Sequence, residues 1–253
     1  MKISVVTAVY NRVDTIAQAI QSVQSQTYSD IEHIIQDGGS NDGTLEVVER
    51  LIPDRDLIQT GRDGGIYDAI NRGIQRTTGD VVGLMHSDDF FASHAILERV
   101  ATAFANPLVQ GVYGDLDYVS AADPNRIVRH WQSGDYSQKR LRRGWMPPHP
   151  ALYLRADVYR RWGLYDTAFK ISADYDAVLR YLTKDGMRLA YVPEVFVKMR
   201  VGGESNRSLE RIMLKSREDL RAIRKNRVGG VGTLAMKNLS KIPQFVTAGF
   251  RSV

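Results

Sequence analysis

The sequence predicts an α/β protein built on a doubly wound, mostly parallel sheet. Short apolar runs of strand length alternate with segments whose apolar residues recur at helical spacing, and this alternation repeats four times before residue 110. Of the 253 residues, 43% are hydrophobic and 25% are charged, which is typical of a globular chain long enough for a large core. Repeated strand–helix alternation favours a parallel sheet covered by helices on both faces.

The first 110 residues contain four strand–helix units. Strands are expected at 2–10, 31–37, 57–60 and 80–85, where mainly apolar runs suit strands buried on both faces. Apolar residues at helical spacing predict helices over 13–23, 45–52, 66–74 and 96–104. We expect Asp14 and Ser93 to cap the first and fourth helices, because short polar side chains can accept hydrogen bonds from free backbone N–H groups.

The alternation becomes looser after residue 110. The segments 111–120 and 126–131 predict two antiparallel strands, and a proline-rich turn at 147–150 leads into another strand over 151–155. Residues 172–185 predict a helix closed by Gly186, followed by a strand over 188–193. The expected organisation is one domain over 1–226, with halves at 1–110 and 111–226, and a basic tail over 227–253.

Positive charge is concentrated toward the C-terminus. From Leu220 onward there is no acidic residue and there are seven basic ones, against a net charge of +5 for the whole chain. A second basic cluster occupies 138–145. Such a tail is compatible with docking on an anionic membrane surface or on nucleic acid, or with a solvated tail that keeps the protein soluble.

The composition also bears on the compartment. The absence of cysteine excludes disulfides and thiolate sites and fits a reducing compartment. No stretch approaches the ~18–20 apolar residues of a membrane span. The N-terminus lacks a small-residue cleavage site, so we interpret it as a first strand and not as a signal peptide. We therefore expect a cytoplasmic protein, with peripheral attachment to the inner face of the cytoplasmic membrane as a hypothesis.

Polar residues follow each of the first four predicted strands. Ligands of open parallel sheets bind beyond the carboxyl ends of the strands, so these residues are expected to share one site. They are Tyr10, Asn11 and Arg12, then Asp37 to Asp42, then Arg62 to Gly65, then His86 to Asp89. Glycine-rich loops of this kind can approach a nucleotide closely and offer it backbone N–H groups. The chain has neither a G-x-G-x-x-G fingerprint nor a G-K-[ST] phosphate loop, which argues against a dehydrogenase or a P-loop NTPase.

Asp88 and Asp89 form an unusual pair at the end of the apolar run 81–85. Two adjacent, partly desolvated carboxylates repel each other, so a cation is expected beside them. Carboxylate oxygens suit Mg²⁺ or Mn²⁺. The alternative is a cluster of capping residues ahead of the next helix.

Five segments together resemble a known family. "ISVVTAVYNR", "QDGGSNDGT", "GGIYDAINRGI", "GDVVGLMHSDD" and "FKISADYDAVLRYL" are similar, in order and spacing, to the motifs of the family 2 glycosyltransferases of bacterial exopolysaccharide and cell-envelope synthesis. The resemblance covers roughly residues 2–205. It implies the GT-A fold, with a Rossmann-like nucleotide-binding half and an acceptor half that holds a small antiparallel sheet, and an inverting, nucleotide-sugar-dependent enzyme.

The resemblance also implies roles for individual residues. Asp89 matches the direct metal ligand, with Asp88 beside it, although His86 replaces the first acidic residue of the family's motif. Asp174 matches the catalytic base, although Ala173 stands where the family often has Glu. Either Asp174 or the Asp88–Asp89 pair could instead serve only to cap a helix.

Further residues are expected at the donor. Asp37 matches the family's nucleobase ligand, with a role in an Asx turn as the alternative. Asp63 is expected near the nucleoside or the sugar, and Tyr10 lies on the same rim. The remaining candidates are Asn11 and Arg12 for the ribose or the diphosphate, His149 for the diphosphate or the acceptor, and Arg200 for a phosphate of the donor. Asn11 could instead be a helix cap, and "MRVGGESN" (199–206) resembles a loop that closes over the donor.

The sequence therefore predicts a metal-assisted glycosyltransferase that uses Mn²⁺ or Mg²⁺. It would move a sugar from a nucleotide-diphosphate donor, with UDP favoured and GDP or dTDP as alternatives, to a hydroxyl of a glycan or lipid-linked acceptor, with Asp174 as base. No nucleic-acid partner is expected. Two other classes stay open at this point: a sugar-nucleotide nucleotidyltransferase and a non-catalytic binding protein of the same fold.

Overall fold

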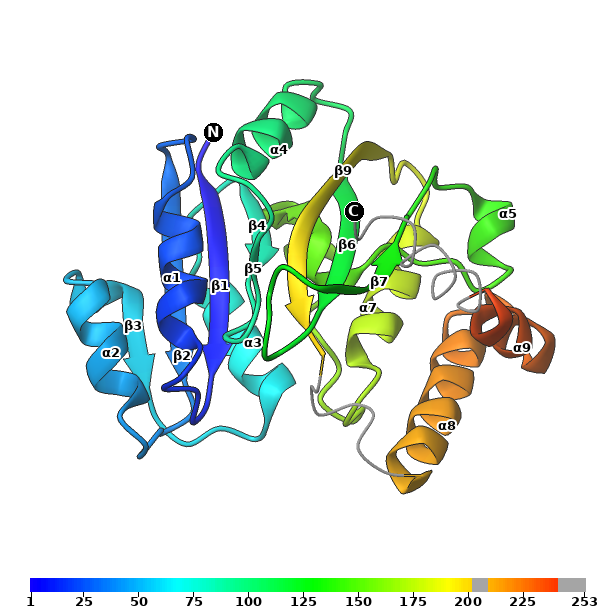
Figure 1. The fold of residues 1–253 in the computed structure, drawn as a ribbon. Coiled ribbons are helices and arrows are strands. Elements are labelled where there is room, and N and C mark those ends of the chain that lie inside the picture. The colour runs from blue at the N-terminus through cyan, green and yellow to red at the C-terminus, as the bar shows by residue number, and fades with distance from the viewer. Residues whose placement is uncertain (202–208, 241–253) are drawn as a thin grey trace.

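The computed structural model describes residues 1–201 and 209–240, and within them nine strands form one sheet. The strand order is β3-β2-β1-β4-β8-β6-β9-β5, with β7 paired to β6 (Figure 1). The strands are β1 Ile3–Val9, β2 Ile31–Asp37, β3 Ile58–Thr60, β4 Val81–Leu84, β5 Phe90–Phe91, β6 Gly111–Val119, β7 Ile127–Trp131, β8 Leu152–Arg155 and β9 Leu189–Arg200.

The predicted doubly wound α/β fold is confirmed. Strands β1 to β4 are parallel neighbours. Strand β8 then runs antiparallel to both β4 and β6, so the predicted antiparallel strands continue the same sheet and do not stand apart from it. The helices are α1 Ile16–Gln24, α2 Thr44–Leu51, α3 Ile66–Arg76, α4 Ile96–Phe104, α5 Gln138–Leu141, α6 Ala156–Trp162, α7 Ala173–Leu182, α8 Leu209–Lys225 and α9 Val231–Leu239.

Alternating side chains of the central strands fill the two faces of the sheet. Val5 and Val81 pack with residues of α1 and α4 on one face. Val6 and Val82 pack with residues of α3 and α7 on the other. This alternation follows from the two-residue period of a strand and explains why the strands of the parallel half are apolar at nearly every position.

Gly83 allows a close approach between β4 and β8. A Cβ atom at Gly83 would lie 2.1 Å from the Tyr153 ring, which fully occupies that space. The aromatic ring is thereby placed against the strand that leads to the paired aspartates.

Several expected element ends were wrong. Helix α1 begins at Ile16 after Thr15, not at a cap formed by Asp14, and α4 begins after Ala95, not after Ser93. The chain around Ser93 first forms β5, in which Phe91 pairs with Val197 of β9. Pairing with a distant strand cannot be seen in local capping signals.

Two further ends differ in the second half. Helix α7 ends at Leu182, and Gly186 lies in the following turn at a φ of +80°. The strand predicted over 188–193 continues as β9 to Arg200, because β6 and β5 both pair with it. Of the predicted closing loop, residues 202–206 lie outside the described residues.

Part of the predicted basic tail is helical. The chain turns after Arg227 and forms α9, which packs beside α8 at one end of the molecule (Figure 1). Residues 241–253, which include Lys241 and Arg251, lie outside the described part of the chain. No helix among the described residues has the length and apolar character needed to cross a membrane.

We expect acid to destabilise the fold through His33 of β2. Burial lowers the pKa of His33 to about 3, and its Nε2 lies 2.9 Å from the Thr7 hydroxyl. Below pH 6.5 the unfolded chain binds a proton that the folded chain does not, so stability falls with pH until about 3. Between pH 6.5 and pH 5, His33 should account for a loss of roughly 2 kcal/mol in unfolding free energy.

Urea unfolding of the wild-type protein and of His33→Gln at both pH values measures this loss. The wild-type protein should lose more stability than His33→Gln, whereas His94→Gln at an exposed position should behave like wild type. Equal losses in all three proteins would contradict the assignment to His33.

Candidate active site at the carboxyl edge of the parallel strands

The parallel strands end side by side. Val9 at the end of β1 pairs with Asp37 of β2, and Asp37 pairs with Thr60 at the end of β3. On the other side of β1, β4 ends at Leu84, which pairs with Val6. The loops that follow these strands therefore meet at one edge of the sheet, as the sequence predicted.

Asp37 organises the loop after β2. Its side chain is fully buried. Its oxygens accept hydrogen bonds from the N–H groups of Gly39 (3.0 Å) and Ser40 (3.1 Å) and from the hydroxyls of Ser40 (2.5 Å) and Thr60 (2.6 Å). This is the geometry of the Asx-turn alternative. Asp37 therefore fixes the shape of the loop after β2.

Gly38 brings two other candidates together. A Cβ atom at Gly38 would lie 2.7 Å from Asp63 Oδ2 and 3.4 Å from the Tyr10 side chain. Asp63 Oδ1 accepts the Gly65 N–H at 2.8 Å, which fixes the carboxylate at the start of α3. Tyr10 is largely exposed. Tyr10, Gly38 and Asp63, from three different loops, thus form one surface at the strand ends.

Asn11 and Arg12 connect the first two loops. Asn11 has a φ of +50°, its N–H donates to Ser40 Oγ at 2.9 Å, and its Oδ1 accepts the Asn41 N–H at 3.0 Å. These contacts differ from a helix cap. The Arg12 N–H donates to Thr44 Oγ1 at 2.7 Å, and its guanidinium donates to the Asn11 carbonyl at 2.9 Å.

The paired aspartates occupy different environments. Asp89 is fully buried, Oδ1 accepts the Arg200 N–H at 3.2 Å, and Oδ2 has no hydrogen-bond partner among the described residues. Burial, reinforced by the charge of Asp88, raises the pKa of Asp89 well above its ordinary value. Asp88 is partly exposed. The guanidinium of Arg200 donates to the Asp88 carbonyl and to Gln18 and lies over the Phe90 ring, so β9 secures this loop.

Two histidines lie next to the paired aspartates. The rings of His86 and His149 are 6.0 Å apart between centroids, and His149 Nε2 lies 2.7 Å from the Tyr165 hydroxyl. Burial lowers the pKa of His149 to about 4 and lowers the pKa of His86. The charges of Asp88 and Asp174 both oppose this lowering of the His86 pKa.

Asp174 lies in the first turn of α7 and is partly exposed. The Tyr67 hydroxyl of α3 lies 3.2 Å from Asp174 Oδ1 and 2.5 Å from the Ile171 carbonyl oxygen. Burial, followed by the charge of Asp174, raises the pKa of Tyr67 well above its ordinary value, so the hydroxyl stays a donor. Asp176, two residues further along α7, points elsewhere: it is fully buried and accepts hydrogen bonds from Asn226 (2.9 Å) and Lys225 (3.1 Å).

Glu218 of α8 holds the loop that precedes Asp174. Its carboxylate accepts the N–H groups of Lys170 (2.9 Å), Ile171 (2.8 Å) and Ser172 (3.0 Å). Glu218 is itself buried. Three hydrogen bonds from consecutive residues fix the chain directly ahead of α7 and thereby the start of the helix that carries Asp174.

The residues at the end of β4 fit a divalent cation. The described residues hold no group of three or more His, Asp or Glu side chains that could bind a metal. However, Mg²⁺ keeps several waters and is commonly bound by one or two carboxylates together with substrate phosphates. Asp88 and Asp89 supply two carboxylates, and Asp89 Oδ2 has no hydrogen-bond partner among the described residues.

Comparisons with known proteins identify the family of this chain. Residues 4–161 match the model of glycosyl transferase family 2. An uncharacterized glycosyltransferase of Mycobacterium tuberculosis is 30% identical over 187 residues, which is 70% of this chain and 68% of the relative. A PGL/p-HBAD biosynthesis glycosyltransferase of the same species is 27% identical over 217 residues, covering 84% of this chain and 82% of the relative.

Solved structures share the fold. S. aureus TarS has a TM-score of 0.66 at 18% identity, and the match covers 100% of this chain but only 44% of that one. The mannosyltransferase PcManGT of Pyrobaculum calidifontis, solved with GDP-Man and Mn²⁺, has a TM-score of 0.66 at 16% identity, with 98% of this chain and 73% of that chain covered. The chain belongs to glycosyl transferase family 2, adopts the GT-A fold and is a glycosyltransferase.

Sequence reasoning missed two residues of the site. Tyr67 lies within the motif "GGIYDAINRGI" but received no role, although a tyrosine in an acidic, glycine-rich segment could have drawn attention. Glu218 lies outside every motif. Nothing in its local sequence shows that α8 returns to the loop before α7.

We expect Glu218→Ala to destabilise the protein by about 2–4 kcal/mol, because three backbone N–H groups lose a charged acceptor. The exposed Glu46 of α2 offers a control, and Glu46→Ala should change the unfolding free energy by less than about 0.5 kcal/mol. Denaturant unfolding measures both. Similar small losses in the two variants would show that the loop does not depend on Glu218.

Proposed function

We propose that this glycosyltransferase moves a sugar from a nucleotide-diphosphate donor to a hydroxyl of a glycan or lipid-linked acceptor in bacterial polysaccharide synthesis. UDP-sugars are the favoured donors, with GDP- and dTDP-sugars as alternatives. The observation that carries the proposal is a continuous set of contacts between the end of β4 and α7. The His86 ring lies 6.0 Å from the His149 ring, and His149 Nε2 lies 2.7 Å from the Tyr165 hydroxyl. The Tyr165 ring stacks on Tyr67 at 6.0 Å, and the Tyr67 hydroxyl lies 3.2 Å from Asp174 Oδ1. Structures of similar fold include TarS with UDP-GlcNAc and PcManGT with GDP-Man.

In the proposed reaction Asp174 is the general base of an inverting, single displacement. It accepts the proton of the acceptor hydroxyl while that oxygen bonds to the anomeric carbon and the nucleoside diphosphate leaves. The Tyr67 hydroxyl can donate to Asp174 Oδ1, which leaves Oδ2 for the acceptor. Glu218 keeps the start of α7 in place during this step.

Asp88 and Asp89 would hold Mn²⁺ or Mg²⁺. A divalent ion there would act as a Lewis acid that stabilises the negative charge of the departing diphosphate. The surface of Tyr10, Gly38 and Asp63 is our proposed contact for the nucleoside, with Asp37 as its support. Asn11, Arg12 and His149 are proposed to border the ribose and the diphosphate. Arg200 is engaged with the Asp88 loop, so we propose that it acts on the donor by holding that loop.

Release of nucleoside diphosphate tests the reaction. The protein is incubated with Mn²⁺ and a panel of UDP-, GDP- and dTDP-sugars, with water or a glycan as acceptor. Release of UDP from one donor supports the proposal. Release of pyrophosphate would indicate a nucleotidyltransferase, and the absence of release from every donor would contradict the proposed donor class.

Asp174→Asn should lower kcat by about 10²–10⁴ while leaving the affinity for the donor near that of wild type, because the amide cannot accept the acceptor proton. Asp157→Asn is the matched control, since Asp157 occupies the first turn of another helix, α6. Steady-state kinetics and donor titration measure the two effects. Turnover by Asp174→Asn at the wild-type rate would exclude Asp174 as the base.

Asp88→Asn and Asp89→Ala should weaken Mn²⁺-dependent donor binding at least about tenfold, because each removes a carboxylate from the proposed ion site. The control variant Asp30→Asn, at an exposed loop position, should leave Mn²⁺-dependent donor binding unchanged. Calorimetric titration with UDP, with and without Mn²⁺, measures the difference. If both site variants kept the wild-type response to Mn²⁺, the metal would have to bind elsewhere.

A further inference from the structure

Helix α9 buries its charged side chain and exposes apolar ones, which is the reverse of the usual pattern of a surface helix. Its one charged residue, Lys237, is 3% exposed, with Nζ 2.7 Å from Asp219 Oδ2 and 3.2 Å from the centre of the Tyr175 ring. A buried ammonium group needs such a partner, because desolvation of an unpaired charge is costly. The only cation of α9 is thus directed into the protein.

The outward side of α9 is mostly apolar, with the exposed polar residue Asn238 at its edge. Val231 and Leu239 are each 62% exposed and Met236 is 44% exposed. Gly232 and Ala235 are exposed between them. Residues separated by three, four or eight positions share a side of a helix, so these five residues form one continuous strip. Surface helices of globular proteins normally present polar residues to water, and a strip of this kind indicates an apolar partner.

Basic side chains lie on the segment against which α9 packs. The Thr233 hydroxyl of α9 donates to the Arg142 carbonyl at 2.9 Å, so α9 packs directly against the chain after α5. Lys139, Arg142 and Arg143 are exposed there and, with Gln138, line a pocket of ≈ 400 Å³. The sequence contains no acidic residue from 136 to 156.

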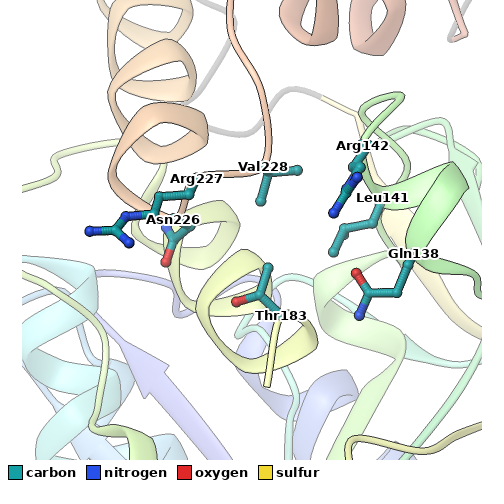
Figure 2. Close-up of a pocket in the computed structure, with 7 residues that line it drawn as sticks. All are labelled: Gln138, Leu141, Arg142, Thr183, Asn226, Arg227 and Val228. Atoms are coloured by element: carbon teal, nitrogen blue, oxygen red, sulfur yellow. The ribbon is translucent and has the colours of Figure 1, made fainter. Parts of the chain in front are cut away.

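A second pocket, of ≈ 310 Å³, lies between α5 and the turn that precedes α9 (Figure 2). Its lining includes Arg142 from the α5 side and Val228 from the turn before α9, and the Arg142 side chain extends toward its interior. The guanidinium of Arg227 points away from the other lining residues. Polar and positively charged groups thus line the space between α5 and the turn that leads into α9.

We propose that the apolar strip of α9 and the basic residues Lys139, Arg142 and Arg143 form one docking surface for an anionic lipid bilayer. Apolar side chains would enter the interface between headgroups and acyl chains, while the lysine and arginines would contact lipid phosphates. The charge complementarity favours a lipid surface over a second copy of the chain. The sequence had suggested the basic tail as a contact with an anionic membrane. Lys237 of that tail is buried, so it cannot contact lipid phosphates.

Vesicle co-sedimentation tests the surface with the full chain and without donor, so the result is independent of the proposed transfer reaction. Wild-type protein should bind vesicles of phosphatidylcholine with about one-third phosphatidylglycerol, should bind pure phosphatidylcholine much more weakly, and should be released by salt. Met236→Gln/Leu239→Gln and Lys139→Gln/Arg142→Gln/Arg143→Gln should each reduce binding at least about tenfold.

Matched control variants carry the same types of substitution at exposed positions outside the proposed surface. Leu108→Gln/Val128→Gln alters two other exposed apolar residues, and Arg50→Gln/Arg99→Gln/Arg126→Gln removes three other exposed cations. Both controls should bind like wild type. Thermal unfolding confirms that each variant is folded, which is expected because all these side chains are exposed.

Three results would overturn the proposal. The first is a wild-type protein that does not bind anionic vesicles. The second is binding that survives both surface variants but disappears on removal of residues 241–253, which would assign the contact to that segment. The third is a dimer in light scattering that is lost in Met236→Gln/Leu239→Gln while vesicle binding is absent, which would assign the strip to a second copy of the chain.

Discussion

The site depends on one constraint, which is that parallel strands deliver their following loops to the same edge of a sheet. The pairing of Val9 with Asp37 and of Asp37 with Thr60 aligns the ends of three strands. Once they are aligned, short hydrogen bonds between loops complete the edge, with Asp37 as acceptor for groups from two of them. The paired aspartates follow β4 directly, and because β4 is parallel to β1 they lie at the same edge. The proposed donor-binding surface therefore follows from strand order and a few polar contacts.

The other half of the site depends on helices that come late in the sequence. Asp174 lies at the start of α7, and the position of that start is set from two sides. Tyr67 contacts it from α3, and Glu218 accepts three N–H groups from α8. Asp219, next to Glu218, pairs with Lys237 of α9. The helix that carries the proposed base is thus supported by both halves of the chain.

The fold and the location of the site were predictable because both follow from periodicity and from residues that succeed each strand. An apolar run in the sequence indicates that β4 is buried, and the glycine-rich loops can be recognised from their composition. What could not be predicted comes from contacts between distant segments. Ser93 failed as a cap because Phe91 pairs with Val197, and Arg200 could not be assigned to the Asp88 loop without the path of β9. Lys237 was counted as part of a basic tail, since no sequence pattern shows that its partner, Asp219, is buried beneath it.

The ion pair between Lys237 and Asp219 has a consequence for the order of assembly during synthesis. Ribosomes extend a chain from its N-terminus, so the sheet and the loops of the parallel half are complete while α9 has yet to be made. Until Lys237 is added, Asp219 and the ring of Tyr175 lack the cation that contacts both. A nascent chain that already holds the proposed nucleotide surface therefore gains this contact to α7, the helix that carries the proposed base, only in a later stage of translation.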